Sequence, residues 1–204
     1  MNSGRIDRRE RMALETRRDI VQAARRLFAE RGYAQTSVND IAAEAGVALQ
    51  TIYARLGSKR GMLMALLELI DEEAGEPEAA VAILTASTPE DALRGQIRLT
   101  RSFQERCGDI ITALFAGAAV EPEFAEVVEE GLRRHRHGAR LTIDRIADLG
   151  GLHDELPARD AIALLSAATT HDAWYELVHA HKLSWDQAEQ TLFHGLARAI
   201  LNPN

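Results

Sequence analysis

Residues 46–59, with the sequence GVALQTIYARLGSK, bring together side chains that could contact a nucleic acid. An amide can pair with the edge of a base, whereas hydroxyl groups and cations can meet phosphates. An exposed Leu and Tyr on so short a segment also cost solvation free energy unless a partner covers them. The side chains concerned are Leu49, Gln50, Thr51, Tyr53, Arg55 and Lys59.

Positive charge is concentrated in the same part of the chain. The protein has 204 residues and a formal net charge of -7. Residues 1–60 contain 12 Lys or Arg and 7 Asp or Glu, a net charge of +5, so the remaining residues carry -12. A basic segment on an acidic remainder is typical of a nucleic-acid binder, because phosphates attract cations. Chance segregation would give the same split, so charge alone decides little.

Three helices are predicted around this segment. Gly32 gives a stop to the first, Ser37 is a good N-cap for the second, and Gly46 can adopt the positive φ of a tight turn before the third. Two short helices joined by a tight turn behind a longer one form a helix-turn-helix, whose second helix enters the major groove of DNA. The predicted ranges are residues 11–30, 37–44 and 48–54. The residues expected to face the first helix are Val38, Ile41, Ala42, Val47 and Ile52.

The rest of the chain also has helical periodicity, and it shows no repeats and no convincing strand. Thr88-Pro89-Glu90-Asp91 is a strong helix start, and Ser184 to Gln187 has the form of a capping box. The fold class is therefore predicted as all-α, with a helix-turn-helix domain at residues 1–60 and a helical domain at residues 61–204. Further helices are predicted at residues 58–73, 88–106, 122–149, 157–168 and 184–201, with a helical segment between the last two that ends near residue 181.

Residues 17–63 closely resemble the N-terminal domain of TetR-type bacterial transcriptional regulators, without a gap. The resemblance rests on Ala-Ala-x-x-Leu-Phe in the first helix, Gly32-Tyr33, Thr36-Ser37-Val38, Asp40-Ile41-Ala42, Ala45-Gly46-Val47, Thr51-x-Tyr53 and Ser58-Lys59. It implies that base and phosphate contacts come from the recognition helix, and further backbone contacts from the starts of the second and fourth helices. By position, the implied DNA-binding residues are Thr36, Ser37, Ala48, Leu49, Gln50, Thr51, Tyr53, Arg55 and Lys59.

Three departures from the family pattern put a borrowed base preference in doubt. Ala48 stands where the family has Ser or Thr, so the recognition helix lacks its side-chain cap. Arg55-Leu56 replaces an aromatic pair, and Arg60-Gly61 replaces acidic residues. The last two changes make the segment more basic, which favours tighter binding to the DNA backbone.

The extreme N-terminus carries a further group of arginines. We weigh two interpretations of this segment equally: a basic arm that reaches into the minor groove, and a disordered solubilising tail. The residues concerned are Arg5, Arg8, Arg9 and Arg11.

The acidic remainder resembles the C-terminal domains of these regulators more loosely. The resemblance implies a homodimer formed by the last two long helices, and small residues such as Ala163 and Ala167 permit the close approach of helices. A two-fold dimer would place paired heads one DNA turn apart, as a palindromic operator requires.

A small-molecule effector would bind inside this C-terminal domain. Arg101, His171 or Asp172 could anchor polar groups of such a ligand, but each of these residues could equally be an ordinary core or interface residue. The candidate ligand-binding residues are Phe103, Cys107, Leu114, Phe115, His171, Trp174 and Tyr175.

Other classes of function find little support in the sequence. No phosphate-binding loop, nucleophile elbow or zinc-hydrolase motif is present, so we expect no enzyme activity and no cofactor. His135 and His137 point to different sides of one predicted helix, and no metal site is expected. The charged N-terminus, the single cysteine and the absence of a long apolar run lead us to expect a cytoplasmic protein without membrane association.

Together these patterns predict a dimeric, sequence-specific transcriptional repressor that a small-molecule effector releases from a double-stranded operator. The alternative is an activator, or a constitutive DNA-binding protein without an effector. The sequence leaves the operator, the effector and the regulated genes open.

Overall fold

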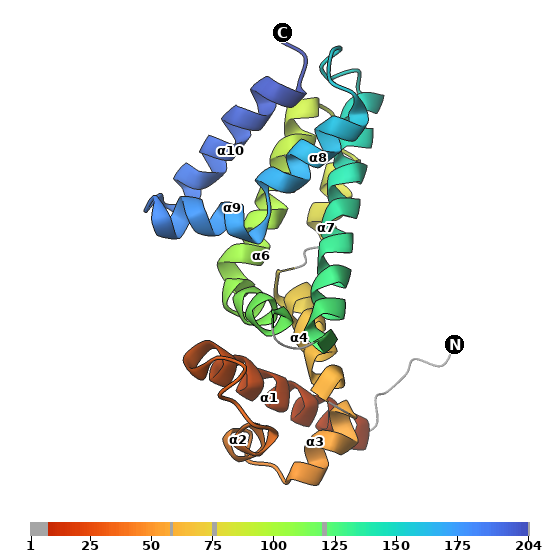
Figure 1. Ribbon diagram of the computed structural model, residues 1–204. Helices are drawn as coiled ribbons and strands as arrows, with labels where there is room; N and C mark the ends of the chain where they lie inside the picture. The colour runs from red at the N-terminus through yellow and green to blue at the C-terminus, as the bar shows by residue number, and fades with distance from the viewer. Residues whose placement is uncertain (1–7, 58, 75–76, 120–121, 204) are drawn as a thin grey trace, which may run out of the picture. The chain divides into compact units, whose positions relative to one another are not determined.

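The computed structural model describes residues 8–57, 59–74, 77–119 and 122–203, and its regular secondary structure within these ranges is entirely helical (Figure 1). This confirms the predicted all-α fold. Among the described residues, extended pairing is limited to an isolated antiparallel bridge between Leu152 and Leu201. The helices are α1 Arg8–Arg31, α2 Val38–Glu44, α3 Leu49–Leu56, α4 Lys59–Ala74, α5 Pro77–Leu84, α6 Pro89–Ala118, α7 Pro122–Asp148, α8 Ala158–Ala168, α9 His171–Tyr175, the π-helix Glu176–Ala180 and α10 Trp185–Ile200.

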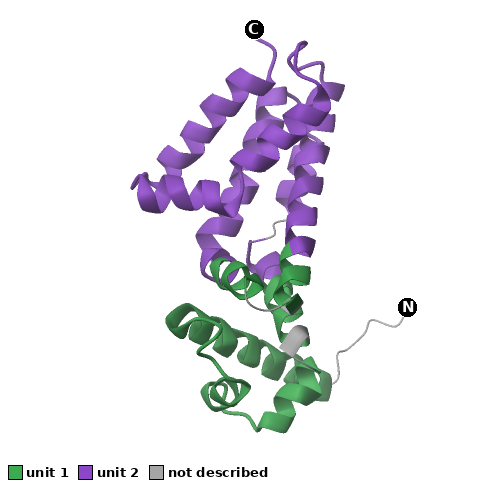
Figure 2. Cartoon of the chain, in the orientation of Figure 1, with its two compact units in different colours: residues 1–69, 112–128 green, residues 70–111, 129–204 purple. Residues whose placement is uncertain are grey.

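The chain divides into two compact units (Figure 2). Unit 1 comprises Met1–Leu69 and Thr112–Val128, and unit 2 comprises Ile70–Ile111 and Glu129–Asn204. Three long helices, α4, α6 and α7, therefore contribute residues to both units. The domain boundary that the sequence predicts between residues 60 and 61 stays a prediction.

In unit 1, α1 buries the apolar stripe that its sequence predicts. Ile20, Ala24 and Leu27 are at most 3% exposed, because residues three and four apart share one face of a helix. At the end of α1, Gly32 takes the positive φ of 77° that ends the helix. The chain then turns so that the Tyr33 ring lies against Phe28, at 5.2 Å, and against Phe124, at 4.0 Å between centroids.

Several helix ends follow the capping signals of the sequence. At the start of α6, the backbone N–H of Asp91 donates to the Thr88 hydroxyl at 3.1 Å. At the start of α10, Ser184 and Gln187 form the expected capping box. After α7, Gly150 has a φ of 69° and Gly151 N–H donates to the Ile146 carbonyl. These caps satisfy backbone groups that a helix end leaves unpaired.

Two sequence predictions in this region are wrong. The helix that begins at Pro89 was expected to end near residue 106, but α6 continues to Ala118. Burial of Ile110 and Leu114 continues the apolar stripe beyond Gly108, and this outweighs the low helix propensity of a single glycine. The sequence also predicts no helix between residues 73 and 88, where the structure has α5.

Trp174 lies at the centre of the apolar core of unit 2. It is fully buried, and its indole N–H donates to the Thr100 hydroxyl at 3.3 Å. This bond satisfies the one polar atom of the ring inside the core. The Trp185 ring lies 5.9 Å from the Trp174 ring, and Phe193 receives the Arg94 guanidinium at 3.6 Å from its centroid.

An ion-pair network joins α6 to α10 at the edge of this core. Arg101 contacts Glu105 at 3.0 Å, Asp186 at 2.7 Å and Glu189 at 2.8 Å, and Arg98 also pairs with Glu189. Burial alone would lower the pKa of Arg101, but hydrogen bonds to Glu189, Asp186 and Glu105 outweigh it and raise the pKa. Arg101 therefore stays charged and is already occupied by carboxylates.

The segment after α9 departs from ordinary helix geometry. Residues Glu176–Ala180 form a π-helix, in which His181 N–H donates to the Glu176 carbonyl at 2.9 Å. Lys182 then adopts a φ of 58°. Among the described residues, it is the one non-glycine residue with a positive φ. Its left-handed conformation allows Leu183 N–H to reach the Leu177 carbonyl at 3.1 Å and ends the helix.

We predict that Lys182→Gly stabilises the protein. Glycine adopts the left-handed region without the steric cost that a side chain adds, so the free energy of unfolding should rise by about 0.5–1 kcal/mol. Urea unfolding monitored by circular dichroism measures the change. Lys182→Ala, which keeps a Cβ, serves as the control and should give no such gain; equal gains from both variants would contradict the backbone explanation.

Candidate nucleic-acid interface

A capping box fixes the start of α2. Asp40 N–H donates to the Ser37 hydroxyl at 3.1 Å, and Ser37 N–H donates back to the Asp40 carboxylate at 2.9 Å. The Ser37 hydroxyl also donates to that carboxylate at 2.6 Å. Hydrogen bonds from the side chain and the backbone of Ser37 lower the pKa of Asp40, since they favour its ionised form.

The turn between α2 and α3 depends on the backbone of Gly46. Its φ is 66°, and no atom lies within 4 Å of the position that a Cβ would take, so the requirement for glycine is conformational and not spatial. Val47 N–H donates to the Ala42 carbonyl at 3.0 Å and closes the end of α2. This is the helix-turn-helix connection that the sequence predicts.

One face of α3 is buried and the other is exposed. Ile52 and Leu56 are 2% and 8% exposed, and α3 contacts both α1 and α2. As predicted, Ala48 provides no side-chain cap, and the helix starts with only the backbone bond from Thr51 N–H to the Ala48 carbonyl at 2.8 Å. The exposed and half-exposed side of α3 carries Ala48, Leu49, Gln50, Thr51, Tyr53, Ala54 and Arg55.

The inward-facing residues of the predicted helix-turn-helix separate into two groups. Ile41, Ala42 and Ile52 are buried, whereas Val38 and Val47 are half-buried at the edge of the core. The exposed fraction of Tyr53 is 49%, large for an aromatic side chain on a helix of 8 residues. The amide of Gln50, the phenol of Tyr53 and the guanidinium of Arg55 therefore project from one short helix that packs against α1 and α2.

The end of α3 lies very close to the start of α4. A Cβ at Gly61 would lie 1.7 Å from the carbonyl oxygen of Leu56, which no real side chain could do. Gly61 is one of the residues that depart from the family pattern, and the structure gives it a steric reason. It allows α4 to begin directly beside the last turn of α3, which fixes the orientation of that helix.

The structure buries one of the predicted DNA-contacting residues, Thr36, and does not describe the side chain of another, Lys59. Thr36 is 8% exposed, and its hydroxyl donates to the Gly32 carbonyl at 2.9 Å and, less closely, to that of Leu27 at 3.3 Å. The structure thus places Thr36 inside the fold, where it braces the end of α1. Lys59 begins α4, but its side chain lies outside the described residues.

The predicted N-terminal arm is in part helical. Arg8, Arg9 and Arg11 belong to α1, which begins at Arg8 and not at Arg11 as expected. Arg5 lies outside the described residues.

The candidate ligand-binding residues are divided between the two compact units. Phe103, Cys107, His171, Trp174 and Tyr175 belong to unit 2, whereas Leu114 and Phe115 belong to unit 1. Trp174 and Cys107 are fully buried, and Tyr175 is 52% exposed.

His171 is half-buried and hydrogen-bonds through Nδ1 to the Gln104 amide oxygen at 2.7 Å. Burial lowers its pKa, while Asp172 opposes this shift and His179 adds to it. A hydrogen bond to the amide oxygen of Gln104 requires that Nδ1 of His171 carries the donated proton.

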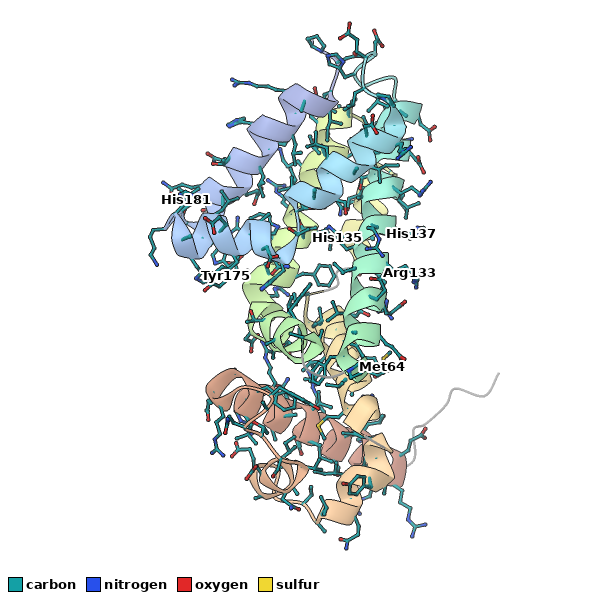
Figure 3. All side chains as sticks on the ribbon, viewed as in Figure 1. Met64, Arg133, His135, His137, Tyr175 and His181 are labelled. Carbon is teal, nitrogen blue, oxygen red and sulfur yellow. The ribbon has the colours of Figure 1, made fainter. Side chains whose placement is uncertain are left out.

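Of the histidines labelled in Figure 3, His135 and His137 lie on α7, and His181 follows the π-helix. His135 bonds through Nε2 to the Ser166 carbonyl at 2.9 Å, whereas His137 is exposed. Among the described residues, no group of three or more His, Cys, Asp or Glu side chains could hold a metal ion. Within the same residues, no helix has both the length and the apolar character needed to cross a membrane.

The geometry of α1, α2 and α3 defines a class of protein, the helix-turn-helix DNA-binding proteins. Residues 20–66 match the family model for bacterial regulatory proteins of the tetR family. The chain is 40% identical over 67 residues to the HTH-type transcriptional regulator TtgR of Pseudomonas putida, a match that covers 33% of this chain and 32% of TtgR. The match thus spans about a third of the length of this relative.

The structural similarity to known proteins extends over nearly the whole chain. FadR from Bacillus subtilis in complex with stearoyl-CoA has a TM-score of 0.72 at 19% identity, and the match covers 88% of this chain and 97% of that chain. NalD of Pseudomonas aeruginosa, the secondary repressor of the MexAB-OprM multidrug efflux pump, has a TM-score of 0.68 at 22% identity, over 95% and 100% of the two chains. At these identities the likeness concerns the fold alone.

Over these N-terminal residues, the chain is similar to transcriptional regulators of the tetR family. The proteins that it matches are regulators, which agrees with the expectation that it is not an enzyme. The resemblance inferred from the sequence is confirmed.

We predict that Asp40→Asn weakens the fold in a pH-dependent way. Because the folded state lowers the pKa of Asp40, its ionised form contributes stability above the ordinary pKa of 3.8, and this contribution is lost as the pH falls through the lowered value. The difference in urea midpoint between wild type and variant should be largest at neutral pH and disappear in acid. A difference that stays constant down to about pH 2.5 would contradict this cause.

We also predict that Gly61→Ala disturbs the end of α3. The added Cβ has to push α4 away from the Leu56 carbonyl, so the free energy of unfolding should fall by about 1–3 kcal/mol. Gly108→Ala is the matched control, since no atom lies within 4 Å of its Cβ position inside α6. That control should leave stability unchanged or raise it by up to about 1 kcal/mol, as measured by thermal unfolding.

Proposed function

We propose that the protein is a homodimeric, sequence-specific repressor that a small-molecule effector releases from a palindromic operator. The observation that carries the DNA-binding part is the two-sided character of α3. Its apolar residues anchor it to α1 and α2, while Gln50, Tyr53 and Arg55 remain exposed. In a chain with a net charge of -7, an exposed aromatic residue and guanidinium on such a helix favour a polyanionic partner.

The roles of the α3 side chains follow from their chemistry. Gln50 can pair in a bidentate way with adenine, and Leu49 can touch the methyl group of a thymine. Arg55 and Tyr53 would contact phosphates and set the register without reading bases. Ser37 and Thr51 would add backbone contacts, and Lys59, as in the family, would meet a phosphate from the start of α4. Thr36 is the weakest member of the predicted set because it is buried.

A dimer surface is proposed on α8 and α10. The exposed residues of α8 include Leu164, at 38%, between Ala163 and Ala167, and α10 exposes Gly195 and Ala199. Small residues permit the close approach of two helices, and an exposed leucine among them gains from burial. Two heads joined in this way could engage successive major grooves, ~34–36 Å apart.

The effector would act through unit 2. The matched FadR structure contains stearoyl-CoA, which supports a ligand-binding role for this fold. The ligand need only prefer a conformation in which the heads no longer match the operator. A 100-fold loss of operator affinity requires a coupling free energy of about 2.7 kcal/mol. Phe103, Cys107, Leu114, Phe115, His171, Trp174 and Tyr175 remain the proposed candidates for ligand contacts.

We predict that Gln50→Ala weakens specific binding more than nonspecific binding. The operator is obtained by selection of duplexes from a random library with the wild-type protein, and affinity is measured by fluorescence anisotropy. Removing a bidentate base contact should reduce affinity for the selected duplex by about 1–3 kcal/mol and leave affinity for random duplex unchanged. Arg55→Ala should instead weaken both, with a smaller salt slope.

Two outcomes would count against the proposal. If the Gln50→Ala and Arg55→Ala variants bound every duplex as the wild type does, α3 would not be the recognition helix. If operator affinity stayed constant in titrations with stearoyl-CoA and with a panel of other acyl, aromatic and cationic small molecules, the effector-released repressor would lose support relative to a constitutive binder.

The dimer is tested separately. Leu164→Arg places a charge on the proposed α8 surface, so sedimentation equilibrium should show a weaker dimer. The exposed Arg140→Ala on α7 provides the control. An unchanged dimer in the Leu164→Arg variant would place the interface elsewhere.

A further inference from the structure

The first turns of α1 extend beyond the core of unit 1. Residues 8–19 precede Ile20, the first buried residue of the helix, and all of them are exposed or half-buried. At a rise of 1.5 Å per residue, Arg8 lies about 18 Å along the helix axis from Ile20. The matched family region also begins at residue 20, so this extension lies outside it.

The first three arginines of the extension differ from several other described arginines in having no acidic partner. Arg17 pairs with Glu68 at 2.5 Å, and Arg26 pairs with Glu44 at 2.9 Å. Within the described residues, by contrast, the side chains of Arg8, Arg9 and Arg11 form no ion pair or hydrogen bond and are exposed. Three cations within one helical turn, against the single carboxylate of Glu10, attract a polyanion.

Several arginines of unit 2 show the opposite behaviour. Arg101 is surrounded by three carboxylates, Arg133 and Arg134 share Glu130, and Arg145 donates to the Ala86 carbonyl. Their charge is largely balanced inside the unit. These paired arginines contrast with the unpaired cluster at the start of α1.

The helical conformation of the cluster decides how it can meet DNA. An α-helix with its side chains is about 10–12 Å wide, whereas the minor groove of B-DNA is about 6 Å wide. An extended arm fits into that groove, but a helix does not. The cations of a helix that cannot enter the groove can still reach the phosphates on its rim.

The exposed apolar residues of the extension argue against a membrane or an apolar protein partner. Met12 and Leu14 are 57% and 54% exposed. They are two residues apart, so they lie on opposite sides of the helix and form no apolar stripe. A membrane-binding helix needs such a continuous stripe. Because the extension lacks one, electrostatic attraction is the main force by which it could hold a partner.

We propose that residues Arg8–Arg11 of α1 bind the phosphate backbone of DNA that flanks the half-site contacted by α3. The proposal rests on the DNA-binding function proposed above, since α1 packs against α3 within unit 1 and both would face the same duplex. It extends the contact with DNA beyond the helix-turn-helix, and it adds affinity without adding base specificity.

The test compares two triple variants on two duplexes. Arg8→Ala/Arg9→Ala/Arg11→Ala removes the charge and keeps a strong helix former at each position, while Arg8→Lys/Arg9→Lys/Arg11→Lys keeps the charge. The probes are a duplex selected by the wild-type protein from a random library, with ten flanking base pairs on each side, and the same duplex without flanks. Circular dichroism and sedimentation confirm that each variant is folded and has the wild-type oligomeric state.

The alanine variant should bind the flanked duplex at least about tenfold more weakly, and its slope of log affinity against log salt should fall by up to about 0.9 for each phosphate that the variant no longer neutralises. Its affinity for the trimmed duplex and its base preference should match the wild type. The lysine variant should retain most of the binding, because binding to a phosphate requires charge more than geometry. The single Arg140→Ala control in unit 2 should change neither value.

Three results would overturn the proposal. If the alanine variant kept the affinity and the salt slope of the wild type, the extension would not touch DNA, while the proposed function would stand. Equal reductions in affinity on both duplexes would place the contacts inside the half-site. No selective binding of any duplex by the wild type would remove the proposed function and this inference together.

Discussion

The close approach of α4 to the end of α3 is the constraint on which the candidate interface depends. The start of α3 is weakly held, because Ala48 offers no cap to the first backbone N–H groups. Its other end is held by the buried Leu56 and by Gly61, whose missing side chain leaves room for the Leu56 carbonyl. The orientation of the exposed residues on α3 is therefore set from its C-terminal end and from the core beneath it.

Apolar and charged residues have different roles in this arrangement. Ile20, Leu27 and Ile52 form a core that needs no charge, and the charged residues of unit 1 lie at its surface, where Arg17 pairs with Glu68 and Arg26 with Glu44. In unit 2, Arg101 is paired with carboxylates and Arg145 with a backbone carbonyl. The pairing of each arginine thus depends on its place in the fold, which total charge alone does not reveal.

Much of the fold could be predicted because its signals are local. The capping residues Ser37, Thr88 and Ser184 and the glycines 32, 46 and 150 mark helix ends through hydrogen bonds and dihedral angles that involve only nearby residues. The end of α6 was predicted wrongly because it depends on burial of Ile110 and Leu114 by distant parts of the chain. Thr36 looked like a surface contact, yet its hydroxyl is used by carbonyls of α1 and the turn after it.

The sequence by itself determined the helical class and the similarity of residues 20–66 to the tetR family, since periodicity, capping and the motif are written in consecutive positions. Tertiary structure decided which of those residues face outward, why position 61 must be glycine, and that the first arginines of α1 are helical and unpaired. It also assigned Leu114 and Phe115 to unit 1 and the other candidate ligand residues to unit 2. These properties arise from contacts between residues far apart in the chain, and no local pattern encodes them.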